Sequence, residues 1–428
     1  MSRTKLEDPD QIVEEYEANK ATDIELEESD TAGNSHDRPY DPAAIRVDPK
    51  TFSLRQIIDM IDDGDLDLAP DFQRNQVWKE KAKSRLIESI LLRIPLPAFY
   101  FSADGDGRLR VVDGLQRLST VHSFVRGGPD KKGAFELNDL EYLDKGVTGL
   151  RFGDLDATWT RRIHQTQIFV NVIDPQTPVQ VKFDIFKRLN TGGTPLNAQE
   201  IRHCMSKPRS REFLKACAGA YQYFYNQETP LSFEDYQSEH KGALSAAIYK
   251  KANLASESFG HATGWAMYNQ VRMVDREVIL RFCAFRLAGE ALEGYGPSTV
   301  MDRFLIDATT TIDSELNDRK LATLAGDLDQ AMQNASELFG EHAFRKWPLG
   351  DDRKKPINRA LFESWAVALA DYTWKDLSPH KAKIIKAVRV KMVSDNDYMN
   401  AVSAGTGDHG RVKLRFETAR QILAKAVG

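Results

Sequence analysis

The apolar pattern of the chain changes near residue 206, and this change constrains the fold more than any other feature. Between residues 41 and 205, short apolar runs of strand length alternate with segments whose apolar residues recur at helical spacing. Beyond residue 206 only long helical patterns follow, such as residues 276–292 and 359–372. We therefore predict an α+β protein, with a mixed α/β domain over residues 41–205 and an α-helical domain over residues 206–428.

The composition is that of a soluble globular protein. The chain has 428 residues and a formal net charge of −5, and 41% of its residues are hydrophobic. No window approaches the roughly 18 uninterrupted apolar residues of a membrane-spanning helix, and the acidic start resembles neither a secretory signal nor a transit peptide. We expect a cytoplasmic protein with no membrane partner. Three widely spaced cysteines favour buried free thiols over a disulfide or zinc site: Cys204, Cys217 and Cys283.

Charge is unevenly distributed along the chain. Residues 1–40 hold 12 acids and 4 bases with few large apolar side chains, which predicts a disordered acidic leader. Residues 341–428 hold 17 bases and 10 acids. This excess has two interpretations: a basic face that binds nucleic acid, or ordinary helices whose charged side chains face water. The sequence leaves both open.

The strongest local motif is VVDGLQRLST, residues 111–120, in which an apolar strand ends at Asp113 and a helix follows Gly114. The first N–H groups of a helix have no intrahelical partner and attract anions such as phosphate. Gly114 lets the backbone approach closely, while Gln116 and Arg117 lie in the first turn, within reach of the same anion. Arginine can hold phosphate through two parallel hydrogen bonds. The alternative is a capped helix in which Asp113 satisfies its own backbone and Arg117 pairs with a surface acid.

A second cluster, PDFQRNQVW, occupies residues 70–78. It places Gln73 and Arg74 on a loop before a helix, and loops on a rigid scaffold often carry binding groups. Trp78 at the end of this cluster is more typical of a core anchor than of a platform on which a base stacks.

The third cluster is FKRLNTGGTPLNAQEIR, residues 186–202. Arg188 and Asn190 end one helix, Gly192 and the glycine after it permit a tight turn, and Glu200 lies in the first turn of the next helix. Asn and Glu oxygens suit Mg²⁺, a hard ion that would accompany a nucleotide. The alternative is a well-capped corner between two helices.

The sequence does not support other common nucleotide-binding or metal-binding motifs. GTGDHG at residues 405–410 has the spacing of a dinucleotide loop, but no strand precedes it. The chain contains no GxxxxGK[ST] loop, and its nine histidines form neither an HExxH motif nor a Cys/His zinc pattern.

Together the three clusters resemble the N-terminal domain family of GmrSD-type modification-dependent restriction systems. Members of that family carry a DGQQR motif on a ParB/sulfiredoxin-like fold. Over residues 50–205 the strings follow in the family's order: PDFQRNQVW, SRLIESILLRIPLPAFYF, VVDGLQRLSTV and FKRLNTGGTPLNAQEIR. Residues 397–423 also resemble the end of single-domain members. The resemblance implies a ParB/sulfiredoxin-like N-terminal domain.

The resemblance also implies a nucleoside triphosphate ligand with Mg²⁺ and, as in characterised members, hydrolysis that governs a DNA-cutting partner domain in phage defence. By position, four residues inherit the phosphate-binding and catalytic roles of the motif: Asp113, Gly114, Gln116 and Arg117. The chain departs from the motif at Leu115, where the family has glutamine. If that glutamine orients water or a phosphate oxygen, hydrolysis would be weak or lost while binding persists. A looser likeness to ParB points to Asn190 as a residue that helps to hold the metal.

The nuclease of these systems carries a His-centred metal motif in a second domain, and residues 206–428 contain none. The resemblance therefore implies a chain that does not cut DNA by itself. It would act as a sensor or regulator, either with a separately encoded nuclease or effector or by altering its own assembly as a homo-oligomer.

Two functions stay open at this point. The first is a switch, or a Mg²⁺-dependent nucleoside triphosphatase, that binds its ligand at residues 113–117 with support from Arg74 and Asn190. The second is a ParB-like DNA-binding regulator without turnover, suggested by the basic C-terminal region.

Overall fold

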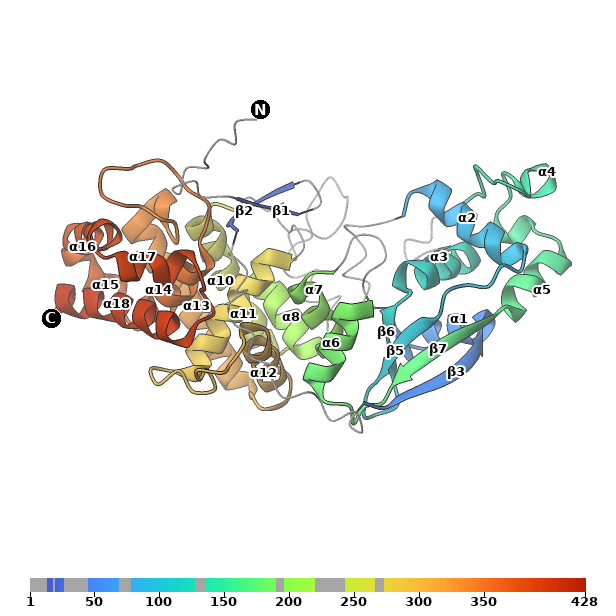
Figure 1. Cartoon of the computed structure of the whole chain (residues 1–428), viewed down its shortest axis with the longest axis horizontal. Helices are drawn as coiled ribbons and strands as arrows, with labels where there is room; N and C mark the ends of the chain where they lie inside the picture. Colours follow the sequence, from blue (N-terminus) through green and yellow to red (C-terminus); the bar gives the residue numbers. More distant parts are fainter. Residues whose placement is uncertain are drawn as a thin grey trace, which may run out of the picture. The chain divides into compact units, whose positions relative to one another are not determined.

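The structure is a computed structural model that describes residues 14–17, 20–26, 45–68, 78–127, 135–189, 196–219, 243–265 and 273–428. The chain divides into two compact units (Figure 1). Unit 1 combines residues Met1–Asp37 with Ser206–Gly428, and unit 2 is Arg38–Met205. Unit 2 is therefore inserted in the sequence of unit 1.

Unit 2 contains a five-stranded sheet and its helices. The strands are β3 Val47–Ser53, β4 Leu66–Asp67, β5 Phe99–Ala103, β6 Leu109–Asp113 and β7 Gln167–Ile173. The helices are α1 Leu54–Asp62, α2 Glu80–Leu91, α3 Leu115–Arg126, α4 Asp144–Val147, η3 Phe152–Asp154, α5 Ala157–Gln165, α6 Val179–Leu189 and α7 Ala198–Met205.

The sheet is mixed, with the strand order β3-β7-β5-β6-β4. β3 pairs antiparallel with β7, β7 pairs parallel with β5, β5 pairs antiparallel with β6, and β6 pairs parallel with β4. A mixed sheet followed by a helical region confirms the predicted α+β class.

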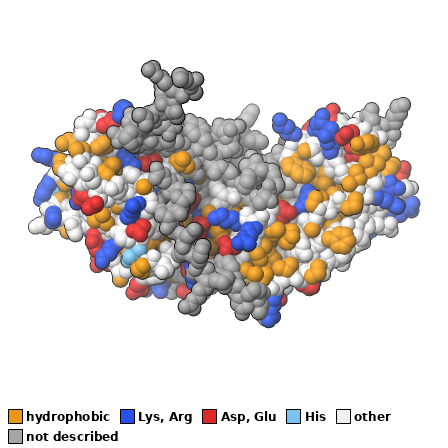
Figure 2. All heavy atoms as spheres, in the orientation of Figure 1, with side chains coloured by type: hydrophobic (Ala, Val, Ile, Leu, Met, Phe, Trp, Pro, Cys, Tyr) orange, Lys and Arg blue, Asp and Glu red, His pale blue; other side chains and the backbone are white. Residues whose placement is uncertain are grey.

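One face of the sheet carries the core of unit 2. Alternate residues of β7 such as Ile168 and Val170 are buried there, against α1, α2, α3 and α5 (Figure 1). This alternation is what a strand with one covered face requires. Phe169 points the other way, and its exposed fraction is 66%. Figure 2 shows hydrophobic side chains gathered over this part of unit 2.

Three local features of the sequence account for elements of unit 2. Ser53 caps α1 in a capping box with Gln56, whose backbone N–H it accepts at 3.2 Å. The apolar runs on either side of residues 104–107, a turn rich in Gly and Asp, form the β5–β6 hairpin, and Gly107 in this turn has φ +90°. Asn197 caps α7, as its position in the sequence predicts.

Unit 1 is mainly helical. A two-stranded hairpin is formed by β1 Glu14–Glu17 and β2 Lys20–Glu25. The helices are α8 Pro208–Cys217, α10 Ala246–Thr263, α11 Val274–Ala288, α12 Met301–Ser314, α13 Asp318–Phe339, η6 Gly340–His342, α14 Arg359–Leu369, α15 Trp374–Leu377, η7 Ser378–His380, α16 Lys381–Ser394, α17 Asn396–Ser403 and α18 His409–Val427. None of the helices in the described residues is long and apolar enough to cross a membrane.

The core of unit 1 lies around α11, where Val278, Ile279, Leu280 and Phe282 are fully buried. α10 packs along α13, and α14 packs against α11, α13 and α18. All three cysteines of the chain are buried free thiols, as the sequence predicts.

The structure differs from the expected disordered leader at residues 20–26. β2 is ordered, and the Ile24 side chain is fully buried in the core of unit 1. Composition did not predict this strand because its acids are neutralised by cations more than 300 residues away, among them Arg345.

Candidate functional site

The junction between β6 and α3 holds the residues for which the sequence predicts an anion site. β6 delivers Asp113, and Gly114 is the N-cap of α3 with φ +99° and ψ 7°. A Cβ atom at residue 114 would lie 2.1 Å from the ring of Phe99, so both the backbone angle and the neighbour require glycine. Because Gly114 offers no side chain to cap α3, the first N–H groups of the helix keep their attraction for an anion.

Arg117 is fixed at this junction by hydrogen bonds and by a contact with an aromatic ring. It donates hydrogen bonds to the carbonyl oxygens of Pro97 at 2.5 Å and Ala98 at 3.3 Å. It also donates to Oδ2 of Asp113 at 2.9 Å. Its guanidinium carbon lies 4.1 Å from the centre of the Phe99 ring, a cation–π contact. The guanidinium is therefore fixed in position, and its hydrogen bonds connect the end of β6 to the residues just before β5.

The charges at the junction partly cancel. Burial lowers the pKa of the Arg117 guanidinium, and the Asp113 carboxylate opposes this shift. The Arg117 side chain is 13% exposed, whereas that of Asp113 is 42% exposed. An anion that reaches the start of α3 would thus meet backbone N–H groups, a fixed guanidinium and one carboxylate.

The other residues of the first turn differ in their surroundings. Leu115, where the family motif has glutamine, packs against the core of unit 2. Gln116 is partly exposed, and its carbonyl oxygen accepts a hydrogen bond from Thr120 at 2.7 Å. The side chain of Gln116 is thus the amide of this turn that a ligand can reach.

The predicted metal ligand Glu200 has a structural role in α7. Its carboxylate accepts the backbone N–H of Asn197 at 2.8 Å, and the Asn197 side chain accepts the backbone N–H of Glu200 at 2.9 Å. This reciprocal pair is a capping box. Within the described ranges, no three His, Cys, Asp or Glu side chains gather as a metal site. Arg188, predicted to bind the cofactor, is exposed in the last turn of α6.

Four other predicted residues lie outside the described residues: Gln73, Arg74, Asn190 and Gly192. The structure thus brings Asp113, Gly114 and Arg117 together and leaves the contributions of these four as predictions.

The sequence analysis missed two residues that support the junction. Phe99 lies against both Gly114 and Arg117. Arg110 of β6 is buried and donates to Asp104 at 3.0 Å and to the carbonyl oxygen of Cys204 at 3.1 Å, which ties β6 to α7. The sequence signal for Arg110 is an arginine within an apolar strand, in the string RLRVV.

Many cations of the basic C-terminal region already have protein partners. α16 has five bases and no acid. Among them, Lys383 donates to the carbonyl oxygen of Lys425 at 2.8 Å, Arg389 pairs with Asp352 at 2.7 Å, and Lys391 pairs with Asp395. Four further bases of the region are less than 9% exposed: Arg345, Lys346, Arg359 and Arg415. This pattern favours the interpretation of the charge excess as structural.

Unit 2 is thus an α+β domain in which Asp113, Gly114 and Arg117 meet at the start of α3. Residues 54–206 match the family described as the GmrSD restriction endonuclease N-terminal domain. This segment of the chain is therefore similar to that domain family, which confirms the resemblance seen in the sequence. The match begins at α1 and ends at the boundary between the two units. No curated protein matches the chain.

Proposed function

We propose that unit 2 binds a nucleoside triphosphate with Mg²⁺ at the start of α3, and that the chain serves as a sensor or regulator of a restriction or anti-phage system. The observation that supports this proposal best is the backbone at Gly114. A left-handed residue followed by a helical one turns successive N–H groups into a single concavity, a geometry that favours phosphate.

The side chains at the start of α3 would have different roles in nucleotide binding and hydrolysis. Arg117 forms three hydrogen bonds to described residues with the five N–H donors of its guanidinium, so two donors are left for a phosphate oxygen. Gln116 would orient a phosphate oxygen or the attacking water, and Asp113 keeps Arg117 in place. Phosphoryl transfer requires mainly positioning and charge stabilisation, which such groups provide. With Leu115 in the core, we expect slow turnover and intact binding.

Phosphate release from ATP, GTP and CTP by the purified full chain with Mg²⁺ tests the proposal. Arg117→Ala should lower turnover and nucleotide affinity at least tenfold. Arg126→Ala is the matched control, because Arg126 lies in the last turn of the same helix and pairs with Asp62. Since Arg117 also holds β5, the melting temperature of each variant is measured first, and Gln116→Ala provides a second variant with less structural risk. Equal activity in wild type, Arg117→Ala and Gln116→Ala would reject the assignment.

The second candidate is a ParB-like DNA-binding regulator without turnover. The five bases of α16 favour it, although several of them are engaged in the protein. Its affinity for DNA would fall steeply with salt, because phosphate contacts release counterions. Thermal protection separates the two candidates: stabilisation by a nucleotide supports the first, and stabilisation by DNA alone supports the second. In either case we propose that a separately encoded nuclease or effector, or self-association, transmits the signal.

A further inference from the structure

The leader segment around Ile24 occupies a strand-binding site on unit 1. Glu25 donates its backbone N–H to the carbonyl oxygen of Ile357 at 2.8 Å, and Ile357 donates its N–H to the carbonyl oxygen of Asp23 at 2.8 Å. Ile24 and Ile357 form a parallel bridge, and Ile357 forms an antiparallel bridge with Arg345 on its other side. Ile357 thus lies between the leader and residue 345, as the central strand of a small ribbon.

Both acids beside Ile24 meet cations of this site. The Arg345 guanidinium holds the Asp23 carboxylate with two hydrogen bonds, at 2.8 and 2.7 Å. Lys346 donates to one oxygen of Glu25, and Asn358 donates to the other at 3.1 Å. The side chains of Glu25, Lys346 and Arg345 are less than 9% exposed. A bidentate arginine selects a planar carboxylate, so the site distinguishes acids from neutral residues.

The site also selects for backbone shape and for an apolar side chain. Asp23 has φ +56°, a conformation that aspartate and asparagine tolerate better than most residues. Ile24, between the two acids, is fully buried in the core of unit 1. The sequence that fits is therefore acid, aliphatic residue, acid, with the first acid in the left-handed conformation, which is the Asp-Ile-Glu of the leader.

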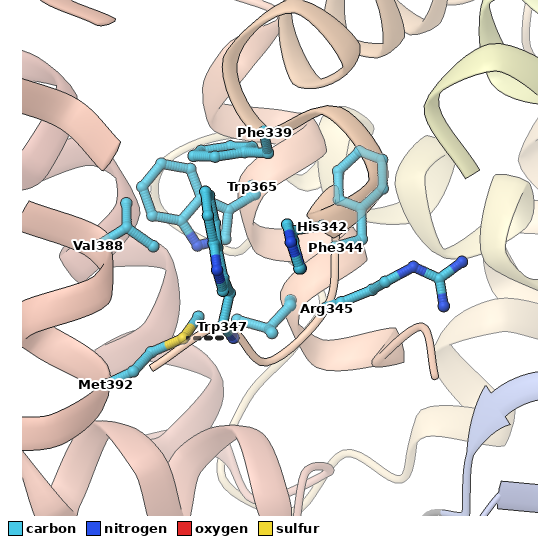
Figure 3. Close-up of a pocket in the computed structure, with 9 residues that line it drawn as sticks. Phe339, His342, Phe344, Arg345, Trp347, Trp365, Val388 and Met392 are labelled. Carbon is cyan, nitrogen blue, oxygen red and sulfur yellow. Dashed lines mark hydrogen bonds between the residues drawn. The ribbon is translucent and has the colours of Figure 1, made fainter. Parts of the chain in front are cut away.

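The same chain segment that binds the leader also lines an aromatic pocket. Figure 3 shows Arg345 extending away from the rings, whereas Trp347, two residues on, lies against His342. These two rings are stacked with their centres 4.2 Å apart. Arg389 covers Trp347 at 4.4 Å. Trp347 is thus held against the core of unit 1, and this holds the backbone that carries Arg345 and Lys346.

Chain connectivity makes the bound leader a tether. The chain leaves the site at Leu26 and enters unit 2 at residue 38, and it returns to unit 1 at residue 206. Unit 2 is therefore joined covalently to unit 1 at residues 37–38 and 205–206, and the docked strand belongs to the unit 1 segment that precedes residue 38. Of residues 22–26, residues 22–25 are buried or partly buried and Leu26 is exposed. A short segment of this kind is held largely by the high effective concentration that the tether provides.

We propose that residues 344–346 and 357–358 form a strand-docking site for acid–aliphatic–acid peptides, which the chain's own leader occupies as a displaceable ligand. Release of the leader frees the N-terminal end of unit 2 and leaves the site able to bind the same sequence from a second copy of the chain.

The test uses the full chain and a fluorescent peptide of residues 20–26, Lys-Ala-Thr-Asp-Ile-Glu-Leu. The leader of the chain is disabled by Asp23→Ala, Ile24→Ser and Glu25→Ala, which leave every residue of the site intact. We expect this variant to bind the peptide at least tenfold more tightly than the wild type, whose site is occupied. A peptide of the same composition in scrambled order should not bind. Adding Arg345→Asp should abolish binding, and a peptide with Asp23→Arg should restore it.

Absence of peptide binding by the leader variant, when it is folded as judged by circular dichroism, would overturn the proposal. Equal binding of the scrambled peptide would do the same. If the triple substitution prevents folding, Ile24→Val/Glu25→Gln is the milder variant. Hydrogen exchange of the Glu25 and Ile357 amides in that variant should accelerate at least tenfold over wild type, while the Leu118 amide in unit 2 stays unchanged. Unchanged exchange at both leader-site amides would contradict a displaceable strand.

Discussion

Gly114 lies against the ring of Phe99 so closely that a Cβ atom at residue 114 would be 2.1 Å from a ring carbon. The same ring supports the Arg117 guanidinium at 4.1 Å. One aromatic side chain therefore fixes both the backbone that opens α3 and the cation beside it. A substitution at Gly114 should disturb the site through this contact.

We predict that Gly114→Ala lowers the free energy of unfolding of the chain by about 2–4 kcal/mol, from the positive φ and the overpacking against Phe99. Gly107→Ala is the matched control, because Gly107 has φ +90° but no atom within 4 Å of its Cβ position. It should cost only about 1 kcal/mol. Urea unfolding monitored by circular dichroism measures both. Equal costs would show that the Phe99 contact does not matter.

Glu88 makes the stability of unit 2 dependent on pH. Burial by itself raises the pKa of the Glu88 carboxyl, but hydrogen bonds from the backbone N–H groups of Glu141, Tyr142 and Leu143 outweigh burial and lower the pKa overall. A lowered pKa in the folded state means that the stabilisation is present above the unfolded value of 4.5 and is lost as pH falls through the folded value.

Glu88→Gln should therefore lower the free energy of unfolding by about 1–3 kcal/mol at pH 7, and the difference from wild type should shrink below about pH 4.5. Glu80→Gln, at an exposed position on the same helix, is the control and should change little. Thermal melts between pH 3 and pH 7 measure the effect. A difference that stays constant with pH would show that the charge of Glu88 plays no part.

Glu363 and Arg415 form an ion pair in which both side chains are fully buried. Removing one partner leaves a buried charge, so we predict that Glu363→Ala lowers the free energy of unfolding by about 3–5 kcal/mol. Lys413 and Glu417 form an exposed pair on the same helix as Arg415, and Glu417→Ala should cost less than about 1 kcal/mol. Chemical denaturation compares the two. Similar losses for both variants would mean that burial of the pair has no energetic consequence.

The predicted role of Glu200 as a metal ligand can be separated from its capping role. Glu200→Gln keeps an acceptor for the Asn197 N–H but removes the charge, whereas Asn197→Ala removes the cap and keeps the charge. If Glu200 binds Mg²⁺, the Mg²⁺ concentration for half-maximal nucleotide binding should rise about tenfold in Glu200→Gln, since a charged ligand is lost. It should stay unchanged in Asn197→Ala. If that Mg²⁺ concentration rises in Asn197→Ala and stays unchanged in Glu200→Gln, the role of Glu200 is limited to capping α7.

The sequence predicted the parts of the fold that depend on neighbours in the chain. The β5–β6 hairpin follows from alternating apolar residues around a turn rich in Gly and Asp, and α3 follows from helical spacing after Gly114. These signals are local, so one sequence is enough to detect them.

Contacts between distant residues were not predictable in the same way. β3 pairs with β7, about 120 residues later, and Asp23 binds Arg345, 322 residues away. The leader has the composition of a disordered segment, but Ile24 is buried in the core of unit 1, and Asp23 and Glu25 pair with distant cations. At the candidate site, the sequence predicted Asp113, Gly114 and Arg117, which lie together in the structure. It missed Phe99 because the ring reaches them only when β5 pairs with β6.

A crystal structure or cryo-EM map of the full chain with Mg²⁺ and a non-hydrolysable nucleoside triphosphate tests the central proposal most directly. The account predicts phosphate oxygens within hydrogen-bond distance of the backbone N–H groups of residues 114–116 and of the Arg117 guanidinium. A triphosphate bound elsewhere, with the start of α3 and the contacts of Arg117 unchanged, would contradict it.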